Sequence, residues 1–452
     1  MKNKNFQTIK TTPQQTQFQL QPDMEICQQD YPLDWYQQEL IPYAEEYLAL
    51  PDRKAETIIP WMTKYIAPAQ KHFGDSLLLL AHYYMGGDIV KLVEYFGGHI
   101  GDSYQLALMA AKNPQKKIIV ESAVHFMAES ISILAHDDQH VYITNPKSGC
   151  TMEMFAKDFM VEPALSELSE RYDILPICYV NTSGRIKALT GKRGGAACTS
   201  SNVKKIFEWA LKQNKKILFI PDKNMGENAA HWLGIKNIAY WPSGMEGANY
   251  SLQNQKTQTL KQFDQAQLIL FSSFCSVHDY FKPAMVDYWH ERGYTVLVHP
   301  EATYSVVEKC DGTGSTAYLW NHVFHDKFKT KKYAVGTENH MVQNLKLICQ
   351  PLGIEVVNLG DAKISDFKGM GCGCATMSRN DPPHLVGVLD LLRQGRTLDF
   401  NEVKPGDVVD EVTGGRERLD QNGQQWIVKY ARRALEKMIE ITEAVPPSSA
   451  QR

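Results

Sequence analysis

The sequence of 452 residues has no apolar segment of the length that a membrane span needs. No stretch of about 18 or more apolar residues occurs, and the basic residues near the N-terminus are not followed by the apolar region of a signal peptide. The formal net charge is only -3. Composition therefore gives no reason to expect nucleic acid or a membrane surface as a partner, and we expect a cytoplasmic protein that acts on small molecules.

Cysteine is sparse as well. Nine cysteines, an odd number, are scattered along the chain, and none of them forms a CxxC pair. A disulfide framework is therefore not expected, and the ordinary role of a single cysteine here is that of a small buried hydrophobic residue. No GxGxxG motif follows an apolar strand, so the sequence predicts no dinucleotide-binding domain.

What the chain does contain is one order of elements repeated three times, between about residues 75 and 377. Each copy opens with a continuous apolar run that ends in polar residues, as a strand of a parallel sheet covered on both faces requires. The three runs are LLLLAHYY from Leu77, DILPICYVN from Asp173 and YTVLVHPEA from Tyr294.

A hydroxyl residue follows each opening strand at the expected start of a helix, and we expect these residues to be N-caps: Ser103, Ser200, and Ser315 with Thr316. A second strand, a helix and a third strand come next. The second strands lie in KKIIVESAVHF, KILFIPDKNMG and KKYAVGTENH, and the third strands lie in HVYITNP, AQLILFSSF and IEVVNLG. A cysteine comes after each third strand: Cys150, Cys275, and either Cys372 or Cys374.

Strands and helices that alternate in this way predict right-handed βαβ crossovers, and hence an α/β fold of three three-layer αβα domains. Ligands of such sheets bind outside the carboxyl ends of the strands. Three domains around a pseudo-threefold axis would therefore turn their polar residues, and one cysteine each, into one central cavity.

The expected domains are residues 61–152, 153–284 and 285–378. Residues 243–266 read as a surface insertion in the second domain. Residues 1–60 are expected to be a partly disordered, partly helical extension, and residues 379–452 to be helical segments.

Three cysteines at equivalent points of a repeat favour an iron-sulfur cluster, because a cubane held by three thiolates keeps one iron open. A three-cysteine zinc site is one alternative, although CxC spacing fits zinc poorly. A second alternative is that the three cysteines are unrelated buried residues. An open iron would act as a Lewis acid in dehydrations of an anionic substrate. The helix N-termini could bind carboxylate or phosphate, or serve only as capped ends.

Four residues at strand ends are candidates for proton transfer: His82, Tyr84, His299 and Glu301. Burial there would move imidazole and carboxyl pKa values toward neutrality. For His82 and for His299 taken alone, a purely structural role is equally expected. His125 is read as a structural residue or as one that supports the site.

Twelve motifs in order resemble the quinolinate synthase family over about residues 70–395. They are AHYY at Ala81 to Tyr84, GDS at Gly101 to Ser103, VHFMAE at Val124 to Glu129, GC at Gly149 and Cys150, YVNT at Tyr179 to Thr182, TSSN at Thr199 to Asn202, PDKNMG at Pro221 to Gly226, CSVH at Cys275 to His278, HPE at His299 to Glu301, GST at Gly314 to Thr316, GTE at Gly336 to Glu338 and CATM at Cys374 to Met377.

The resemblance implies three pseudo-symmetric domains around a [4Fe-4S] cluster, and a transferase that condenses iminoaspartate with dihydroxyacetone phosphate to quinolinate, the precursor of NAD. It implies cluster ligands at Cys150, Cys275 and Cys374, where Cys374 is favoured over Cys372 because the family has a cysteine three residues before a methionine. The implied catalytic residues are His82, Tyr84 and Glu301. The implied substrate-binding residues are His82, Ser103, Tyr179, Val180, Asn181, Ser200, His299, Pro300, Glu301 and Thr316.

The partners that follow are the two substrates, together with an enzyme that produces iminoaspartate and proteins that assemble the cluster. Two other classes remain as alternatives. One is a non-catalytic relative that keeps the cluster as a sensor or a structural staple, and the other is a different dehydratase or a zinc enzyme on a similar scaffold.

Overall fold

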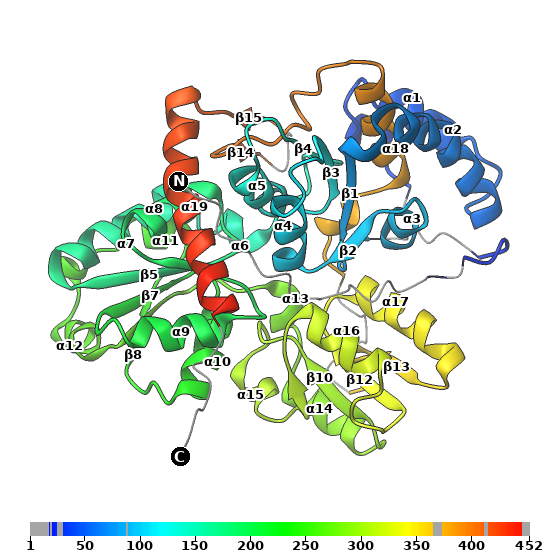
Figure 1. Ribbon diagram of the computed structural model, residues 1–452. Helices are drawn as coiled ribbons and strands as arrows, with labels where there is room; N and C mark the ends of the chain where they lie inside the picture. Colours follow the sequence, from blue (N-terminus) through cyan, green and yellow to red (C-terminus); the bar gives the residue numbers. More distant parts are fainter. Residues whose placement is uncertain are drawn as a thin grey trace, which may run out of the picture.

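Three parallel sheets organise the computed structural model, which describes residues 18, 20–24, 30–86, 89–364, 373–410 and 415–444. The first sheet has the order β2-β1-β3-β4 and the third has the matching order β11-β10-β12-β13. The second has the order β6-β5-β7-β9-β8, which adds one strand at its edge. Figure 1 shows the three sheets as separate parts of the molecule, the first cyan, the second green and the third yellow.

All nine strands that the sequence predicts are present, so the prediction of an α/β fold with parallel sheets is confirmed. In the first sheet they are β1 (Leu77–His82), β3 (Ile118–Ser122) and β4 (His140–Ile143). In the second they are β5 (Ile174–Tyr179), β7 (Lys216–Ile220) and β9 (Leu268–Phe271). In the third they are β10 (Thr295–Val298), β12 (Lys332–Gly336) and β13 (Glu355–Asn358).

Six further strands were not predicted. β14 (Val408–Val409) and β15 (Arg416–Glu417) form a separate antiparallel pair. The other four belong to the three parallel sheets: β2 (His99–Gly101), β6 (Ala196–Cys198), β8 (Ile238–Trp241) and β11 (Gly312–Thr313). Each lies at the edge of its sheet. Two or three residues are too few to show a strand pattern in sequence, and β2, β6 and β11 are extended because each pairs with a longer neighbour. β8 pairs with β9, which is also four residues long.

Strand β1 shows why its sequence is apolar at every position. Leu78 and Leu80 pack into one core on one face of the sheet, whereas Leu77, Leu79 and Ala81 pack into another core. All five side chains are buried, and each leucine contributes roughly 1.5–3 kcal/mol of hydrophobic stabilisation. A strand covered on both faces ends where its polar residues begin, and this places His82 at the carboxyl edge.

Two of the predicted N-caps, Ser103 and Ser200, are wrong. The cap of α4 (Ser103–Ala111) is Asp102, whose carboxylate accepts a hydrogen bond from the Gln105 backbone N–H at 3.0 Å, so Ser103 is the first helical residue. The cap of α9 (Val203–Leu211) is Asn202, two residues after Ser200. Asp102 takes the cap because its carboxylate and the Gln105 side chain bond reciprocally to the backbone. Only Ser315 caps its helix, α16 (Thr316–Phe324), as predicted.

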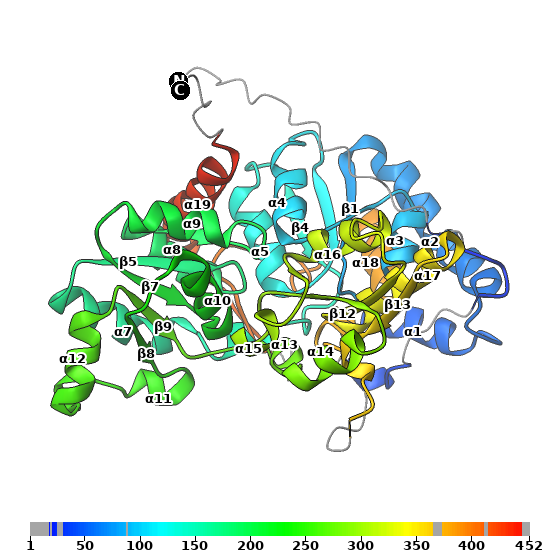
Figure 2. The same cartoon turned by 90° about the horizontal axis from the view of Figure 1, so that it is seen from below.

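Residues 243–266, which the sequence predicts to be a surface insertion, contain two packed helices. These are α11 (Gly244–Ala248) and α12 (Thr257–Gln265), and both Leu252 and Phe263 are buried. The Glu167 carboxylate on α7 (Asp158–Arg171) accepts a hydrogen bond from the Leu252 backbone N–H at 2.6 Å. Figure 2 shows α11 and α12 at the outer edge of the second sheet.

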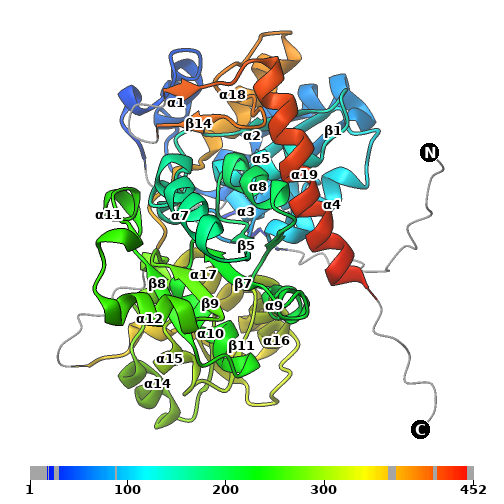
Figure 3. The ribbon, with the colours of Figure 1, turned by 90° about the vertical axis from the view of Figure 1, so that its left-hand side faces the viewer.

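The terminal segments join the body of the protein. Helix α18 (Pro382–Arg393) packs against α1 (Ile41–Leu48) and α2 (Ala55–Phe73). Helix α19 (Gln421–Glu443) runs along α8 (Gly184–Lys192), as Figure 3 shows. The expected disorder at the N-terminus falls largely on residues outside the described part of the chain, and so does Cys372. Among the described residues, none of the helices combines the length and the apolar character that crossing a bilayer requires.

Candidate active site

Polar side chains that follow strands of the three sheets meet in one place. Tyr84, after β1, lies with its hydroxyl 2.6 Å from the Thr337 hydroxyl, after β12. Tyr179, at the end of β5, donates a hydrogen bond of 2.5 Å to Glu301, which follows β10. All four side chains are buried. The carboxyl ends of the three sheets therefore share one buried polar site.

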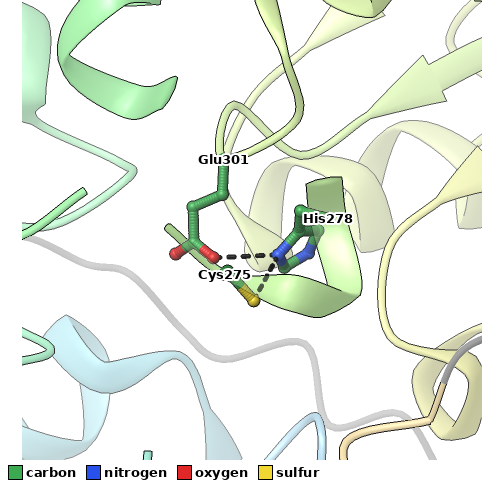
Figure 4. Close-up of side chains that lie close together, drawn as sticks. All are labelled: Cys275, His278 and Glu301. Atoms are coloured by element: carbon green, nitrogen blue, oxygen red, sulfur yellow. Dashed lines mark hydrogen bonds and ion pairs between the residues drawn. The ribbon is translucent and has the colours of Figure 1, made fainter. Parts of the chain in front are cut away.

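His278 is the centre of this site. Its Nδ1 atom lies 2.8 Å from the Glu301 carboxylate and 3.3 Å from the Cys275 sulfur (Figure 4). Its Nε2 atom lies 3.1 Å from the Thr337 hydroxyl, and its ring stacks on His299 with centroids 4.5 Å apart. His278 lies one turn after Cys275, which begins the short helix α13 (Ser276–Asp279), so one helical turn brings both side chains to the same place.

Each of three cysteines brings a thiol toward this site. Cys150 begins α6 (Thr151–Met154), Cys275 begins α13, and Cys374 precedes a 3-10 turn at Met377–Arg379. A side-chain partner lies near each sulfur: Asn181 Nδ2 is 3.9 Å from Cys150, and the Thr376 hydroxyl is 3.3 Å from Cys374.

The three thiols also influence one another electrostatically. Burial raises the pKa of Cys150, and the Cys374 thiolate raises it further. Burial raises the pKa of Cys275, followed by the charges of Glu301, Cys150 and Cys374. Thiolates that raise one another's pKa repel, and a positive centre between them would remove this repulsion, because a bound metal favours the deprotonated thiol. The donor set therefore fits an iron-sulfur cluster, whose irons would neutralise the thiolates.

Histidine pKa values differ from the sequence-based expectation. Burial lowers the pKa of His82 to about 3, and burial together with the neighbouring His278 lowers the pKa of His299 to about 3. Both imidazoles are neutral at pH 7. The expectation of near-neutral pKa values was wrong because no nearby charge is strong enough to offset the loss of solvation.

The Glu301 pKa also moves the opposite way. Burial alone would raise it, but His278 and His299 and the hydrogen bonds from His278 and Tyr179 lower it below the ordinary value. Burial and then the Glu301 charge raise the pKa of both Tyr84 and Tyr179 well above 10. Glu301 is therefore a stable carboxylate in this site.

The remaining predicted residues are placed differently. Thr316 is buried at the start of α16, near Tyr84, whose raised pKa it partly lowers. Val180 donates its backbone N–H to the Cys198 carbonyl at 2.8 Å, and Asn181 follows it toward Cys150. Ser103 and Ser200 are partly exposed at helix starts, and within the described residues neither shows a direct bond to the buried group.

Four residues that sequence reasoning missed also build the site. His278 and Thr337 belong to it directly. Asn224 and Asn228, on α10 (Lys223–Leu233), donate to the Glu301 and Pro300 carbonyls at 3.2 and 2.8 Å and so hold the loop that carries Glu301. His278, Thr337 and Asn224 lie in the motifs CSVH, GTE and PDKNMG, and Asn228 lies two residues after the last of these, but only their contacts reveal a role.

One subset of these residues matches the zinc alternative. Ligand atoms of Cys275, His278 and Glu301 lie within 4.8 Å of one another. The cluster interpretation uses only the sulfur of this group and assigns His278 and Glu301 to hydrogen bonding. Measuring the zinc and iron content of the purified protein distinguishes a zinc site from an iron-sulfur cluster.

Known proteins are similar to this chain over most of its length. A family model described as "Quinolinate synthetase A protein" matches residues 65–408. A quinolinate synthase of Acidobacterium capsulatum is 34% identical over 406 residues, which is 88% of this chain and 95% of that protein. A quinolinate synthase of Geobacillus kaustophilus is 35% identical over 356 residues, 77% of this chain and 90% of that protein. A quinolinate synthase of Bacillus velezensis is 34% identical over 340 residues, which is 74% of this chain and 86% of that protein. The chain therefore belongs to the quinolinate synthetase A family.

Proposed function

We propose that this protein is a transferase that condenses iminoaspartate with dihydroxyacetone phosphate to quinolinate in NAD biosynthesis. The balanced reaction releases one phosphate and two waters. The observation that carries the proposal is the convergence of three thiols, one after each sheet, on a buried group of imidazole, phenol and carboxylate. A cytoplasmic location fits this function, with an iminoaspartate-producing enzyme and cluster-assembly proteins as partners.

The architecture that we infer is three αβα domains, at residues 61–152, 153–284 and 285–378, around a pseudo-threefold axis. The matching strand orders of the first and third sheets, and the extended version in the second, support this arrangement. Residues 1–60 and 379–452 then form outer helical segments, which agrees with the packing of α18 on α1 and α2.

The cofactor that we assign is a [4Fe-4S] cluster held by Cys150, Cys275 and Cys374. When bound, it supplies an open iron that serves as a Lewis acid. Hydrogen bonds to thiolate sulfurs tune such clusters, and Asn181, His278 and Thr376 are the side chains close enough to make them.

Proton transfer is assigned to the Glu301 carboxylate together with Tyr84 and His82. Glu301 is a carboxylate at neutral pH because its pKa is lowered, so it can take a proton from a carbon or nitrogen acid, and the Tyr179 hydroxyl at 2.5 Å stabilises its charge. The Tyr84 hydroxyl is oriented by Thr337 at 2.6 Å and, with its raised pKa, acts as a neutral donor.

Substrate binding is assigned to the other side chains of the site. His82 and His299 are neutral imidazoles that offer one N–H and one acceptor each. Tyr179, Asn181 and Thr316 add hydroxyl and amide donors, and Val180 and Pro300 set the backbone beside them. Ser103 and Ser200, at two helix starts, would hold carboxylate or phosphate oxygens.

The test is anaerobic purification, measurement of iron and sulfide, and assay of quinolinate from the two substrates. Cys275→Ala should lose the brown absorbance and the activity, because one of three ligands is removed. Cys310→Ala is the matched control, since this half-buried thiol bonds only to the Val307 and Gly312 carbonyls among the described residues. A Cys275→Ala variant that keeps both properties would refute the ligand assignment. A cluster without product would favour the sensor alternative, and zinc alone would favour the zinc enzyme.

A further inference from the structure

A second group of potential metal ligands lies apart from the candidate active site. His125 and Glu129 stand one turn apart on α5 (His125–Leu134), and Glu153 lies on α6. Their ligand atoms all lie within 4.8 Å of one another. His125 and Glu129 are buried, and the Glu153 side chain is 13% exposed. None of the three belongs to the candidate active site described above.

Two atoms of this group have no hydrogen-bond partner. His125 Nε2 and one Glu153 oxygen, Oε2, are buried and unpaired, and His125 Nδ1 is 3.9 Å from the other Glu153 oxygen, which is too far for a hydrogen bond. Buried polar atoms almost always find a partner, so two unpaired atoms on neighbouring side chains whose ligand atoms lie within 4.8 Å point to a bound ion or water. A cavity of about 20 Å³ lined by His125 and Glu153 adjoins them, which is room for one small ion.

The charges of the group also call for a cation. Glu129 and Glu153 bring two carboxylates, and three cations lie nearby. The Lys187 ammonium donates to the Thr182 carbonyl, Arg416 pairs with Asp407, and Lys157 lines the cavity. Within the described residues none of the three makes an ion pair with Glu129 or Glu153. A proton on His125 would supply charge, yet it would leave the Nε2–H without an acceptor. A metal ion satisfies the imidazole nitrogen and the carboxylate oxygens together.

We propose that His125, Glu129 and Glu153 bind one divalent first-row metal ion, of the Mn²⁺ or Zn²⁺ class. One imidazole nitrogen with two carboxylate oxygens is a donor set that suits these ions. The i, i+4 spacing of His125 and Glu129 places both on one face of α5, so two ligands are preorganised and α6 provides the third.

The role of this ion is structural, at the junction of the first and second sheets. The two Glu129 oxygens already accept backbone N–H groups from Gly184, at the start of α8, and from Gly406, at 2.6 and 2.7 Å. Glu153 lies three residues after Cys150 on the helix that Cys150 begins. An ion between them ties α5, α8 and the Gly406 segment to the helix that carries Cys150.

The experiment is metal analysis of the anaerobically purified holoprotein, followed by Mn²⁺ titration in which the EPR signal of free Mn²⁺ reports binding. We expect a single non-cluster ion per chain, present on purification or taken up from Mn²⁺. Glu153→Gln should weaken binding by at least about 10–100-fold, while its cluster iron stays near the wild-type amount. Glu402→Gln is the matched control, because that side chain is also 13% exposed and pairs with His140 elsewhere.

Two outcomes would overturn the proposal. The first is wild-type holoprotein that contains no non-cluster ion and leaves the free Mn²⁺ signal unchanged. The second is equal Mn²⁺ affinity in the wild type and in Glu153→Gln. If Glu153→Gln does not fold, His125→Gln takes its place, and the wild-type stoichiometry decides independently of any variant.

Discussion

Glu121 should make the stability of this protein fall as pH rises. It lies on β3 with its side chain fully buried, and neither carboxylate oxygen has a hydrogen-bond partner. Burial raises the pKa of this carboxyl from 4.5 to about 8. The folded protein therefore keeps Glu121 protonated at pH values where the unfolded chain has already lost the proton.

The direction and size of this pH effect on stability follow from the difference in proton binding between the folded and unfolded states. Below about pH 4.5 both states are protonated, so Glu121 carries no ionisation penalty. Between about pH 4.5 and 8 only the unfolded state ionises, and the free energy of unfolding decreases by about 1.4 kcal/mol for each pH unit. Over the range from about pH 5 to 8 this amounts to about 4 kcal/mol, a large part of the stability of a typical protein.

Glu121→Gln isolates this effect, because the amide has nearly the same shape and does not titrate. Urea unfolding followed by tryptophan fluorescence, in anaerobic buffer at several pH values, gives the free energy of unfolding of both proteins. We expect the variant to gain stability relative to the wild type by about 4 kcal/mol between about pH 5 and 8. The exposed Glu308→Gln should follow the wild type at every pH. A difference that stays constant with pH would refute the reasoning.

Three further predictions concern other parts of the molecule. Glu301→Gln should lower kcat by about 10²–10⁴-fold with unchanged iron content, since it removes a base and no thiolate; quinolinate formation and iron analysis check this. Gly191→Ala should destabilise the packing of α19 on α8 by about 1–3 kcal/mol, because its Cβ would lie 2.0 Å from the Tyr430 carbonyl oxygen; thermal unfolding measures it. Tyr36→Phe should cost about 1.5–3 kcal/mol, because it removes a 2.7 Å hydrogen bond to the buried Asp381 carboxylate, and the same assay applies.

Each of these predictions has an outcome that contradicts it. Full activity in Glu301→Gln would remove this residue from proton transfer. A wild-type melting temperature in Gly191→Ala would mean that the two helices separate at no cost. An unchanged stability in Tyr36→Phe would mean that the remaining bonds of Asp381, which accepts from the His384 backbone N–H and contacts its ring at 2.6 Å, suffice.

Sequence alone predicted nine of the strands of the three parallel sheets, and the polar residues at the carboxyl ends of the opening strands. The reason is local: a strand buried on both faces must be apolar at every position, as β1 is, and the pattern ends where the strand ends. The cysteine after each third strand was visible for the same reason, because a repeat marks equivalent positions without any knowledge of contacts.

Tertiary structure alone decided what depends on contacts between distant segments. The short strands β2, β6 and β11 exist because β1, β5 and β10 pair with them. His278 and Thr337 join the site through contacts with residues from other sheets. The Glu301 pKa falls, rather than rises, because two imidazoles and a phenol face it. Local pattern sets which segments form elements, whereas hydrogen bonds and charges between those elements set what the site can do, and these interactions are absent from any single stretch of sequence.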